Sequence, residues 1–379
     1  MATARSFRVR PFLCAQNPER LSQEPSLARG RPGETGAPAS TPCVTSGETL
    51  RGVSRARPTG PAIPSPLDAI KTVPAQTATG ESYVLKNHAY LITAYTNRPQ
   101  LEQLLSLLDD ERNDVYLQTD SKGSLAVDGL SLRRSRLIIL PPFPMYWGGY
   151  SVIQAELNLL RAASGSRYHY YHLLTGTDLP LVTQGVVHAR LDDSEAQYVD
   201  FAPEYQAIAH WKAAYFHLLV ETRLYTRNTP FRIAGHGIVK AQSILGIDRS
   251  RKESETYFHG STYFSITHRL VEYVLAHEPW IRRTFRYTLA CDEVFLQTLI
   301  MRSSYRSEVA SRDSGNATNL RYIDWRRRDK NSPYTFRMAD YEELVEASRH
   351  HLFARKFNTT VDAAIVDTIV RRIKNNGGL

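Results

Sequence analysis

Two carboxylates lie where this chain could bind a polar ligand. Asp120 and Asp178 each follow an apolar run that is typical of a buried strand. They therefore fall at the carboxyl ends of two predicted strands, and these ends form the usual ligand-binding edge of a parallel sheet. Asp also favours the turns that follow strands, so Asp120 is equally open to a binding role and a turn-forming role. For Asp178, a role in capping the turn before Pro180 is the favoured interpretation.

Most generic catalytic motifs are missing from the sequence. The chain contains no GxxxxGK[ST] phosphate loop, no GxGxxG or GxSxG turn and no HExxH zinc motif. It contains no Asp-x-Asp sequence, no CxxC pair and no Cys/His cluster with the spacing of zinc ligands. These absences argue against the kinds of chemistry that each motif marks.

The segments that carry the two carboxylates alternate between strand and helix patterns. Strand patterns are short apolar runs, whereas helix patterns repeat apolar residues every three or four positions. The strand patterns cover 89–95, 115–120, 136–141 and 168–181, the last of which ends in a polar turn, and helix patterns cover 98–110 and 151–163. This alternation predicts an α/β fold with a mostly parallel central sheet flanked by helices. After residue 200 the chain is more helical, with patterns over 204–224, 267–277 and 292–301. It closes with the segment 341–357 and a C-terminal helix over 361–374.

The first part of the chain differs from the rest in composition. Residues 1–80 contain eleven of the 20 prolines and only two aromatic residues, Phe7 and Phe12. Such a composition buries too little apolar surface to offset the loss of chain entropy on folding. The sequence therefore predicts a disordered Pro/Arg/Ser-rich tail over 1–84 and one folded domain over 85–379.

The positive charge of the chain is unevenly distributed. The formal net charge is +9, and residues 1–80 alone contain ten Lys/Arg against five Asp/Glu. The predicted domain is therefore only weakly basic, and its charge does not indicate a nucleic-acid partner. A weakly basic surface is compatible with an anionic substrate such as a nucleotide diphosphate.

The cysteines and the hydropathy pattern indicate in which cellular compartment the protein is expected. Cys14 and Cys43 lie in the predicted tail, and Cys291 alone lies in the predicted domain, where it has no partner for an intradomain disulfide. This favours a reducing compartment. No run of about 18 apolar residues occurs, so no transmembrane helix is predicted.

Eight short blocks occur in an order that resembles one enzyme family. They are HAYLITAY (88–95), VYLQTDSKGSL (115–125), YWGGYSVIQAELNLL (146–160), HLLTGTDLPL (172–181), GSTYFSITHRLVEYVL (260–275), CDEVFLQTLI (291–300), LRYIDW (320–325) and HHLFARKF (350–357). Together they are similar to the core-2/I-branching β-1,6-N-acetylglucosaminyltransferases and their peptide O-xylosyltransferase relatives, glycosyltransferase family fourteen. The resemblance implies a GT-A-like domain, a UDP-sugar donor, inversion at the anomeric carbon and catalysis without a divalent metal. The missing Asp-x-Asp sequence agrees with the last expectation.

The resemblance assigns the catalytic base to Glu293. An inverting transfer needs a carboxylate that takes the proton of the attacking hydroxyl. Glu293 is expected in the first turn of a helix, where the helix dipole favours its anionic form. Cys291 replaces a proline that is frequent in the family, which loosens the turn but removes no chemistry. Without the resemblance, Glu293 would be interpreted as an ordinary first-turn carboxylate.

The resemblance also assigns the residues that bind the donor. Arg355 and Lys356 match basic residues that the family places on the donor's diphosphate, where fixed cations stabilise the leaving group in place of a metal. No cofactor is therefore expected. Asp120 matches in part the segment that contacts the uridine ribose or base, although Gln118 and Thr119 depart from the family's pattern.

Five further residues are expected near the donor or the acceptor. They are Asp178, Trp147, Arg321, Asp324 and Trp325. Trp147 begins a Trp-Gly-Gly-Tyr turn, for which a structural role is the favoured interpretation.

The expected function is the transfer of a sugar, GlcNAc in the first place, from UDP to a hydroxyl of a glycan or glycoconjugate. The alternatives are a peptide O-xylosyltransferase-like enzyme that uses UDP-xylose and an inactive relative that binds nucleotide sugars or carbohydrates. Retention of Glu293 and Lys356 argues against the inactive relative. The animal members have a membrane anchor and several disulfides, which this sequence lacks. A bacterial-type, cytoplasmic enzyme is therefore expected, with peripheral association at the inner face of the membrane.

Overall fold

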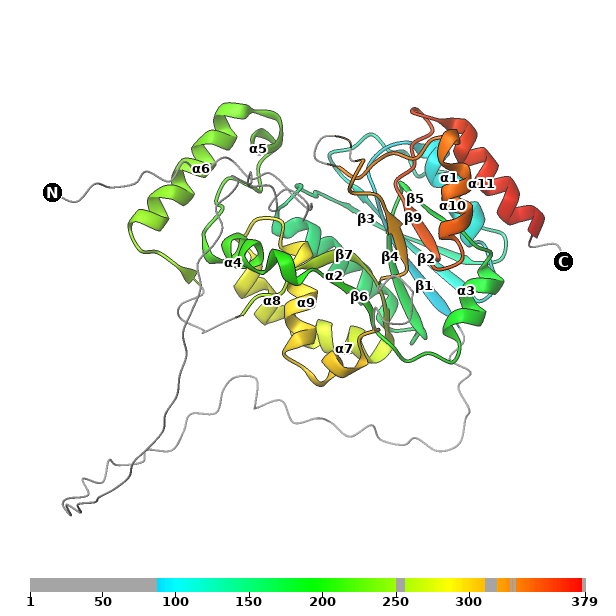
Figure 1. Cartoon of the computed structure of the whole chain (residues 1–379), viewed down its shortest axis with the longest axis horizontal. Coiled ribbons are helices and arrows are strands. Elements are labelled where there is room, and N and C mark those ends of the chain that lie inside the picture. Colours follow the sequence, from blue (N-terminus) through cyan, green and yellow to red (C-terminus); the bar gives the residue numbers. More distant parts are fainter. Residues whose placement is uncertain (1–86, 250–255, 311–318, 328, 330–331, 377–379) are drawn as a thin grey trace, which may run out of the picture. The chain divides into compact units, whose positions relative to one another are not determined.

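A six-stranded sheet forms the centre of the protein (Figure 1). The structure is a computed structural model that describes residues 87–249, 256–310, 319–327, 329 and 332–376, so the tail predicted over 1–84 lies outside the described residues. The strand order is β3-β2-β1-β4-β7-β6. The strands are β1 (His88–Ala94), β2 (Asn113–Asp120), β3 (Arg136–Phe143), β4 (Tyr170–Thr175), β6 (Tyr198–Phe201) and β7 (Gly260–Thr267).

The central sheet is mostly parallel, as the alternating pattern predicts. β1 to β4 pair in parallel, whereas β7 pairs antiparallel with β4 and with β6. Parallel pairing requires a crossover between successive strands, and α1 (Arg98–Leu108) and α2 (Tyr150–Ser164) lie in two of these crossovers. The predicted α/β class is confirmed.

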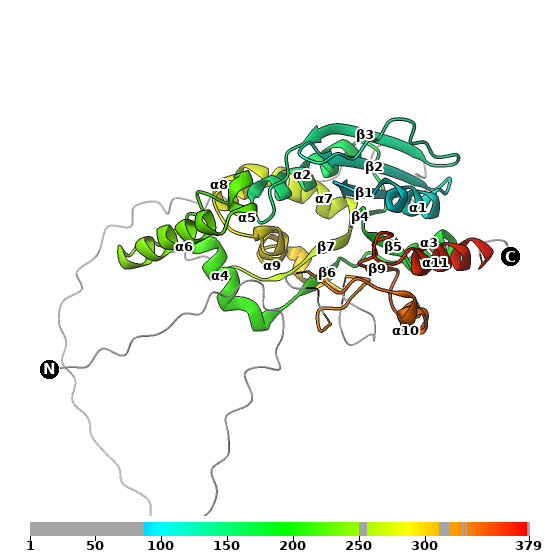
Figure 2. The ribbon, with the colours of Figure 1, turned by 90° about the horizontal axis from the view of Figure 1, so that it is seen from above.

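Each face of the sheet is covered by its own hydrophobic core (Figure 2). Successive residues of a strand point to opposite faces, so Ala89 and Leu91 enter one core and Tyr90 and Ile92 the other. The first core is completed by α2, α7 (His268–Ala276), α8 (Glu278–Phe285) and α9 (Phe295–Met301). The second is completed by α1, α3 (Gln184–Leu191), α10 (Tyr341–Ala347) and α11 (Ala363–Asn376).

A second, three-stranded sheet contributes side chains to the second hydrophobic core, the one that contains α1 and α11. Its order is β5-β9-β8, with β5 (Asp178–Pro180), β8 (Arg321–Ile323) and β9 (Phe353–Arg355). The single strand predicted over 168–181 is therefore wrong, because β4 ends at Thr175 and the chain turns into the other sheet. The apolar pattern continues through this turn, so periodicity alone cannot show the change of sheet. The segment 341–357 likewise contains both a helix and a strand.

The helical region after residue 200 is more broken than its pattern predicts. The segment 204–224 forms α4 (Gln206–Ala214) and then an irregular stretch before α5 (Arg223–Arg227). In that stretch, His217 N donates to the Tyr287 carbonyl at 2.7 Å, which replaces a helical hydrogen bond by a tertiary one. The helix α6 (Thr229–Ile244) follows and was not predicted. No helix in the described part of the chain is both long and apolar enough to cross a membrane.

Candidate active site

Glu293 ends a short 3₁₀ turn that connects α8 to α9. The turn covers Cys291–Glu293, and the α-helix begins only at Phe295. Glu293 therefore lies two residues before the first residue of α9, outside the first helical turn that was predicted for it. The preceding Ala290 has a left-handed φ of 48°, and its N–H donates to the Gly148 carbonyl at 2.7 Å. The turn of Glu293 is thus fixed against the Trp-Gly-Gly-Tyr turn.

Two basic side chains hold the Glu293 carboxylate. Lys212 of α4 forms an ion pair with Oε2, and His259 Nε2 lies 3.3 Å from the same oxygen. The Lys212 ammonium also lies 3.1 Å from His259 Nε2. Burial alone would raise the pKa of Glu293, but Lys212 and then His259 outweigh it and lower the pKa to about 2. Glu293 is therefore ionised at neutral pH, and the contacts with Lys212 and His259 engage Oε2, so that among the described residues Oε1 is left for another partner.

Two further acids lie beside Glu293 and have the opposite tendency. Asp292 accepts a hydrogen bond from Thr262 Oγ1 at 2.9 Å, and burial together with the charge of Glu293 raises its pKa to about 6. Glu156 of α2 is fully buried without a hydrogen-bond partner for either oxygen among the described residues. Burial, aided by Asp292, raises the pKa of Glu156 well above its ordinary value. The pKa values of three neighbouring carboxyl groups are thus shifted in opposite directions, a pattern typical of acid–base sites.

Arg355 is held by a buried carboxylate from the neighbouring strand. Asp178 lies opposite Arg355 in the β5–β9 pairing, and their side chains form an ion pair of 2.7 Å. Arg355 also donates to Thr175 Oγ1, and its guanidinium lies 4.5 Å from the ring centroid of Tyr263. Burial would lower the pKa of Arg355, but Tyr263 and Asp178 raise it above its ordinary value. Two of the predicted site residues, Arg355 and Asp178, are thereby brought together.

Lys356 differs from Arg355 because it has no anionic partner close by. Its ammonium donates to Ser332 Oγ at 2.6 Å. Within the described ranges, no carboxylate lies at ion-pair distance from it. Burial lowers the pKa of Lys356, and the charge of Asp329 acts in the opposite direction. A half-buried ammonium that is bonded only to a hydroxyl is suited to accept an anionic ligand.

Strand β7 connects the Glu293 turn with Arg355. His259, directly before the strand, contacts Glu293, and Thr262 contacts Asp292. Tyr263 contacts Arg355 through its ring, and burial raises the pKa of its hydroxyl, to which Asp292 and Glu156 also contribute. A stretch of five residues therefore brings the predicted base and the predicted diphosphate cation into one site.

Asp120 and Trp147 lie in turns. Asp120 ends β2, forms an ion pair of 2.7 Å with Lys122 and accepts from the backbone N–H groups of Lys122 and Met145 at 3.0 and 3.3 Å. Trp147 is 52% exposed. Gly148 follows it with a φ of 75°, which requires a glycine or a strained residue. Both residues thus have the turn geometry that the sequence allows, and Trp147 presents a free aromatic surface next to the Glu293 turn.

Arg321 and Asp324, two of the residues predicted from the block LRYIDW, make hydrogen bonds to other residues of the chain. Arg321 is buried and donates to Ser265 Oγ at 2.7 Å and to the Phe264 carbonyl at 2.6 Å, which joins the two sheets. Asp324 accepts from the backbone N–H groups of Arg326 and Arg327 at 2.7 and 3.0 Å. Trp325 is half-buried. Arg321 therefore connects β8 to β7, and Asp324 holds the turn that follows β8, in both cases through backbone groups.

Comparison with known protein families identifies the family of this chain. The family model described as "Branch: Core-2/I-Branching enzyme" matches residues 88–347. This chain belongs to the core-2/I-branching enzyme family. The match covers the Glu293 turn, Lys212 and the whole of β7, and it ends before Arg355 and Lys356.

Curated relatives of this family member are named xylosyltransferases. It is 30% identical to xylosyltransferase 2 of Canis lupus familiaris over 311 residues, which cover 71% of this chain and 31% of the dog protein. It is 29% identical to xylosyltransferase 2 of Rattus norvegicus over 127 residues, which cover 29% of this chain and 14% of the rat protein. This chain thus spans under a third of the length of these relatives.

Several residues of this family member's site were missed at the sequence level. Lys212 lies 81 positions before Glu293, inside an ordinary amphipathic helix, and no spacing rule connects the two. His259 and Glu156 are likewise recognised only through their contacts. Tyr263 lies inside a block that carried the resemblance, GSTYF, so its position in the block is the only feature that pointed to it.

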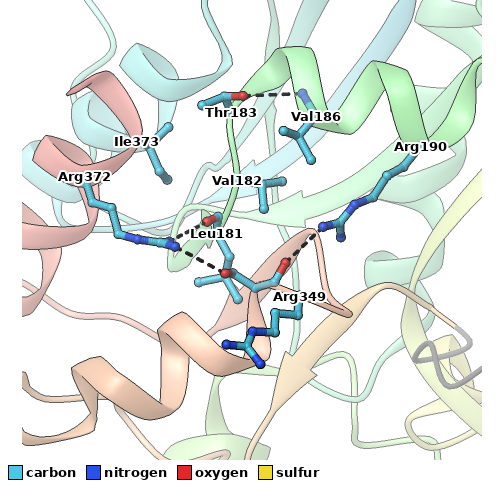
Figure 3. Close-up of a pocket in the computed structure, with 9 residues that line it drawn as sticks. Leu181, Val182, Thr183, Val186, Arg190, Arg349, Arg372 and Ile373 are labelled. Carbon is cyan, nitrogen blue, oxygen red and sulfur yellow. Dashed lines mark hydrogen bonds between the residues drawn. The ribbon is translucent and has the colours of Figure 1, made fainter. Parts of the chain in front are cut away.

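A surface cavity lies elsewhere on this enzyme family member, between α3 and α11 (Figure 3). Its volume is about 280 Å³, and it is lined by Leu181, Val182, Thr183, Val186, Arg190, Ser348, Arg349, Arg372 and Ile373. Arg190 donates to the Ser348 carbonyl at 3.3 Å, and Arg372 donates to the Leu181 carbonyl at 3.2 Å. These guanidinium groups connect neighbouring segments, and none of the predicted site residues lines the cavity.

Proposed function

We propose that this core-2/I-branching family member is an inverting, metal-independent glycosyltransferase that moves a sugar from UDP to a hydroxyl of a glycan or glycoconjugate. The observation that carries the proposal is the ionised Glu293 carboxylate, which Lys212 and His259 hold through Oε2 in the described part of the chain. The oxygen Oε1 is the atom that would meet the acceptor hydroxyl. The GT-A-like class and the donor-binding role of Asp120 belong to the same proposal.

The proposed reaction is a single in-line displacement. The acceptor oxygen attacks the anomeric carbon, and the bond from that carbon to the β-phosphate oxygen breaks, with its electron pair left on UDP. The acceptor proton passes to Glu293 as the new bond forms. The low pKa of Glu293 keeps its carboxylate unprotonated at neutral pH, so that it is free to accept this proton. Lys356, with Arg355 beside it, would stabilise the charge that develops on the diphosphate.

Two donor sugars are candidates. GlcNAc is the first, from the resemblance to β-1,6-N-acetylglucosaminyltransferases, and xylose is the second because the curated relatives are named xylosyltransferases. UDP release from UDP-GlcNAc, UDP-xylose, UDP-GalNAc and UDP-glucose, measured with EDTA present, decides between them. UDP binding without turnover of any donor, over a panel of glycan acceptors, would favour the inactive relative.

UDP binding is expected to be independent of divalent metal. The sequence lacks Asp-x-Asp, and the Asp178 carboxylate is already neutralised by Arg355. Calorimetric titration of UDP should therefore give the same dissociation constant in EDTA and in added Mn²⁺. A strict Mn²⁺ requirement would contradict the proposal, and Asp178 would then have to leave Arg355 to bind the ion.

Lys356→Ala should weaken UDP binding by about 1.5–3 kcal/mol, the scale of one charge-assisted hydrogen bond. The reason is that the Lys356 ammonium has only Ser332 as a described partner. Lys374→Ala is the matched control, because Lys374 is exposed on α11. Equal UDP affinities of the two variants would remove Lys356 from the donor site.

We propose that the protein acts at the cytoplasmic face of a membrane, with peripheral association. Apolar side chains on and around α5 and α6 support this proposal. Leu224, Ile233, Ile244 and Leu245 are 48–76% exposed. Sedimentation of the protein with anionic lipid vesicles tests the association, and failure to sediment would contradict it.

A further inference from the structure

Four histidines gather at the edge of the central sheet that lies opposite Asp120. His88 begins β1, His169 directly precedes β4, His172 lies within β4, and His188 lies on α3. All four are buried. The rings of His88 and His188 stack with centroids 4.0 Å apart, and those of His88 and His172 are 5.0 Å apart. This cluster lies at the amino-terminal ends of the strands and takes no part in the proposed transfer.

One nitrogen of His88 is fixed by a chain of hydrogen bonds. His88 Nδ1 lies 3.2 Å from His172 Nε2, and His172 Nδ1 lies 2.7 Å from Ser265 Oγ. Arg321 donates to the same Ser265 oxygen at 2.7 Å. The other nitrogen of His88, Nε2, is buried and has no hydrogen-bond partner in the described part of the chain. Because buried polar groups normally have a partner, this nitrogen is available to bind a ligand.

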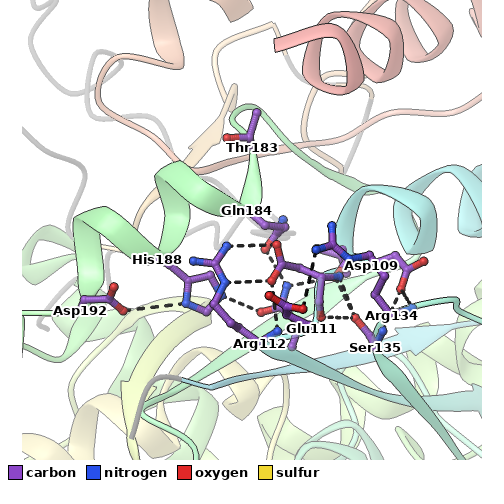
Figure 4. Close-up of polar contacts among 12 residues, drawn as sticks. Asp109, Glu111, Arg112, Arg134, Ser135, Thr183, Gln184, His188 and Asp192 are labelled. Atoms are coloured by element: carbon purple, nitrogen blue, oxygen red, sulfur yellow. Dashed lines mark hydrogen bonds and ion pairs between the residues drawn. The ribbon is translucent and has the colours of Figure 1, made fainter. Parts of the chain in front are cut away.

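His169 and Asp192 direct further ligand atoms to the same place. His169 Nδ1 is also buried without a partner within the described ranges, while its Nε2 lies 3.6 Å from Glu195. Asp192 follows the last residue of α3 and reaches toward His188 at 3.8 Å (Figure 4). One ligand atom each from His88, His169 and Asp192 lie within 4.8 Å of one another.

We propose that His88, His169 and Asp192 bind one Zn²⁺ ion at this edge of the sheet. Two imidazoles and one carboxylate are a donor set typical of Zn²⁺, whereas Mg²⁺ and Ca²⁺ prefer oxygen ligands. Ligand atoms in a tetrahedral zinc site are about 3.4 Å apart for bonds of about 2.1 Å. The set has to contract, and Asp192 can move because its side chain is 34% exposed.

The surroundings are compatible with a cation. Arg112, whose charge acts on His88, is neutralised by Asp110 through two contacts of 2.9 and 3.0 Å. The hydrogen bond between His88 Nδ1 and His172 Nε2 orients the His88 ring, as partners of metal-binding histidines do. The ion would join β1, β4 and α3 and so stabilise the fold.

The test uses the full chain, stripped with EDTA and desalted, and Zn²⁺ alone as the probe. We expect calorimetry to show one ion bound with high affinity and the melting temperature to rise with Zn²⁺. Asp192→Asn and His169→Gln should each weaken binding at least about tenfold. Asp193→Asn is the matched control, because this residue is also exposed but lies outside the ligand set.

Equal Zn²⁺ affinities of Asp192→Asn and Asp193→Asn, or a melting temperature of the unsubstituted chain that Zn²⁺ does not raise, would overturn the proposal. UDP titration of the Asp192→Asn variant shows whether a failure of the zinc proposal also affects the proposed glycosyltransferase function. The zinc site lies at the other end of the strands from the donor site, so UDP affinity should not change in this variant.

Discussion

Glu293→Gln should lower turnover by about 10²–10⁴-fold, the usual contribution of a general base. Glutamine keeps the size of the side chain and can still contact Lys212 and His259, but it cannot take the proton of the acceptor. UDP affinity should change little, because the diphosphate is assigned to Lys356 and Arg355. Steady-state rates with the preferred donor, together with UDP calorimetry, measure both quantities.

Asp292→Asn is the matched control for this experiment. Asp292 is the adjacent residue, and its carboxylate already accepts a hydrogen bond from Thr262. Its effect on turnover should be much milder. If Glu293→Gln keeps near-normal turnover, or loses folding and UDP binding together, Glu293 is a structural residue. A larger loss in Asp292→Asn would transfer the role of base to Asp292, whose raised pKa of about 6 also suits a base.

The central sheet could be predicted because its signals are local. β1, β2 and β4 are apolar runs, as expected for strands that are buried on both faces, and α1 and α2 repeat apolar residues at helical spacing. β3 is also an apolar run, but its residues are mostly exposed or half-buried. The small sheet could not be predicted in the same way. β5, β8 and β9 have three residues each. Asp178 of β5 pairs with Arg355 of β9, and Arg321 of β8 pairs with Phe353 of β9, so every pairing joins segments that are distant in sequence. Such short strands form only because the surrounding core holds them together.

In the candidate site, too, residues that lie in short sequence blocks could be predicted, whereas their partners from distant parts of the chain could not. The order of the blocks led to Glu293, Arg355 and Lys356, and the structure brings Arg355 to the carboxylate of Asp178. The partners of Glu293 could not be inferred. Lys212, for example, lies 81 positions before Glu293, in a helix whose sequence carries no motif. Arg321 was expected in the pocket, but its guanidinium satisfies the Phe264 carbonyl between the two sheets. A buried arginine needs such acceptors, and the sequence does not show where they are.

Lys212→Met should destabilise the folded protein by about 3–5 kcal/mol at pH 7, the cost of leaving one partner of a buried ion pair unpaired. The side chains of Lys212 and Glu293 are only 10% and 16% exposed. Methionine fills a similar volume, so the lost charge is the main change. Denaturant unfolding measures the effect, and Lys374→Met on the surface of α11 is the control, with an expected change near zero.

The pH dependence of this variant separates the loss of charge from a loss of packing. In the unsubstituted protein, the pKa of Glu293 is about 2, below its ordinary value of 4.5, so its contribution to stability is present above pH 4.5 and is lost as the pH falls through 2. Without Lys212, burial and the neighbouring Asp292 raise the pKa of Glu293, although His259 still opposes them. The destabilisation should then shrink on acidification from pH 7 to 5, because protonation neutralises the unpaired carboxylate. Adding Glu293→Gln to Lys212→Met should restore most of the lost stability at pH 7. If the double variant is as unstable as Lys212→Met at both pH values, the ammonium acts through packing, and Glu293 does not depend on it for its charge.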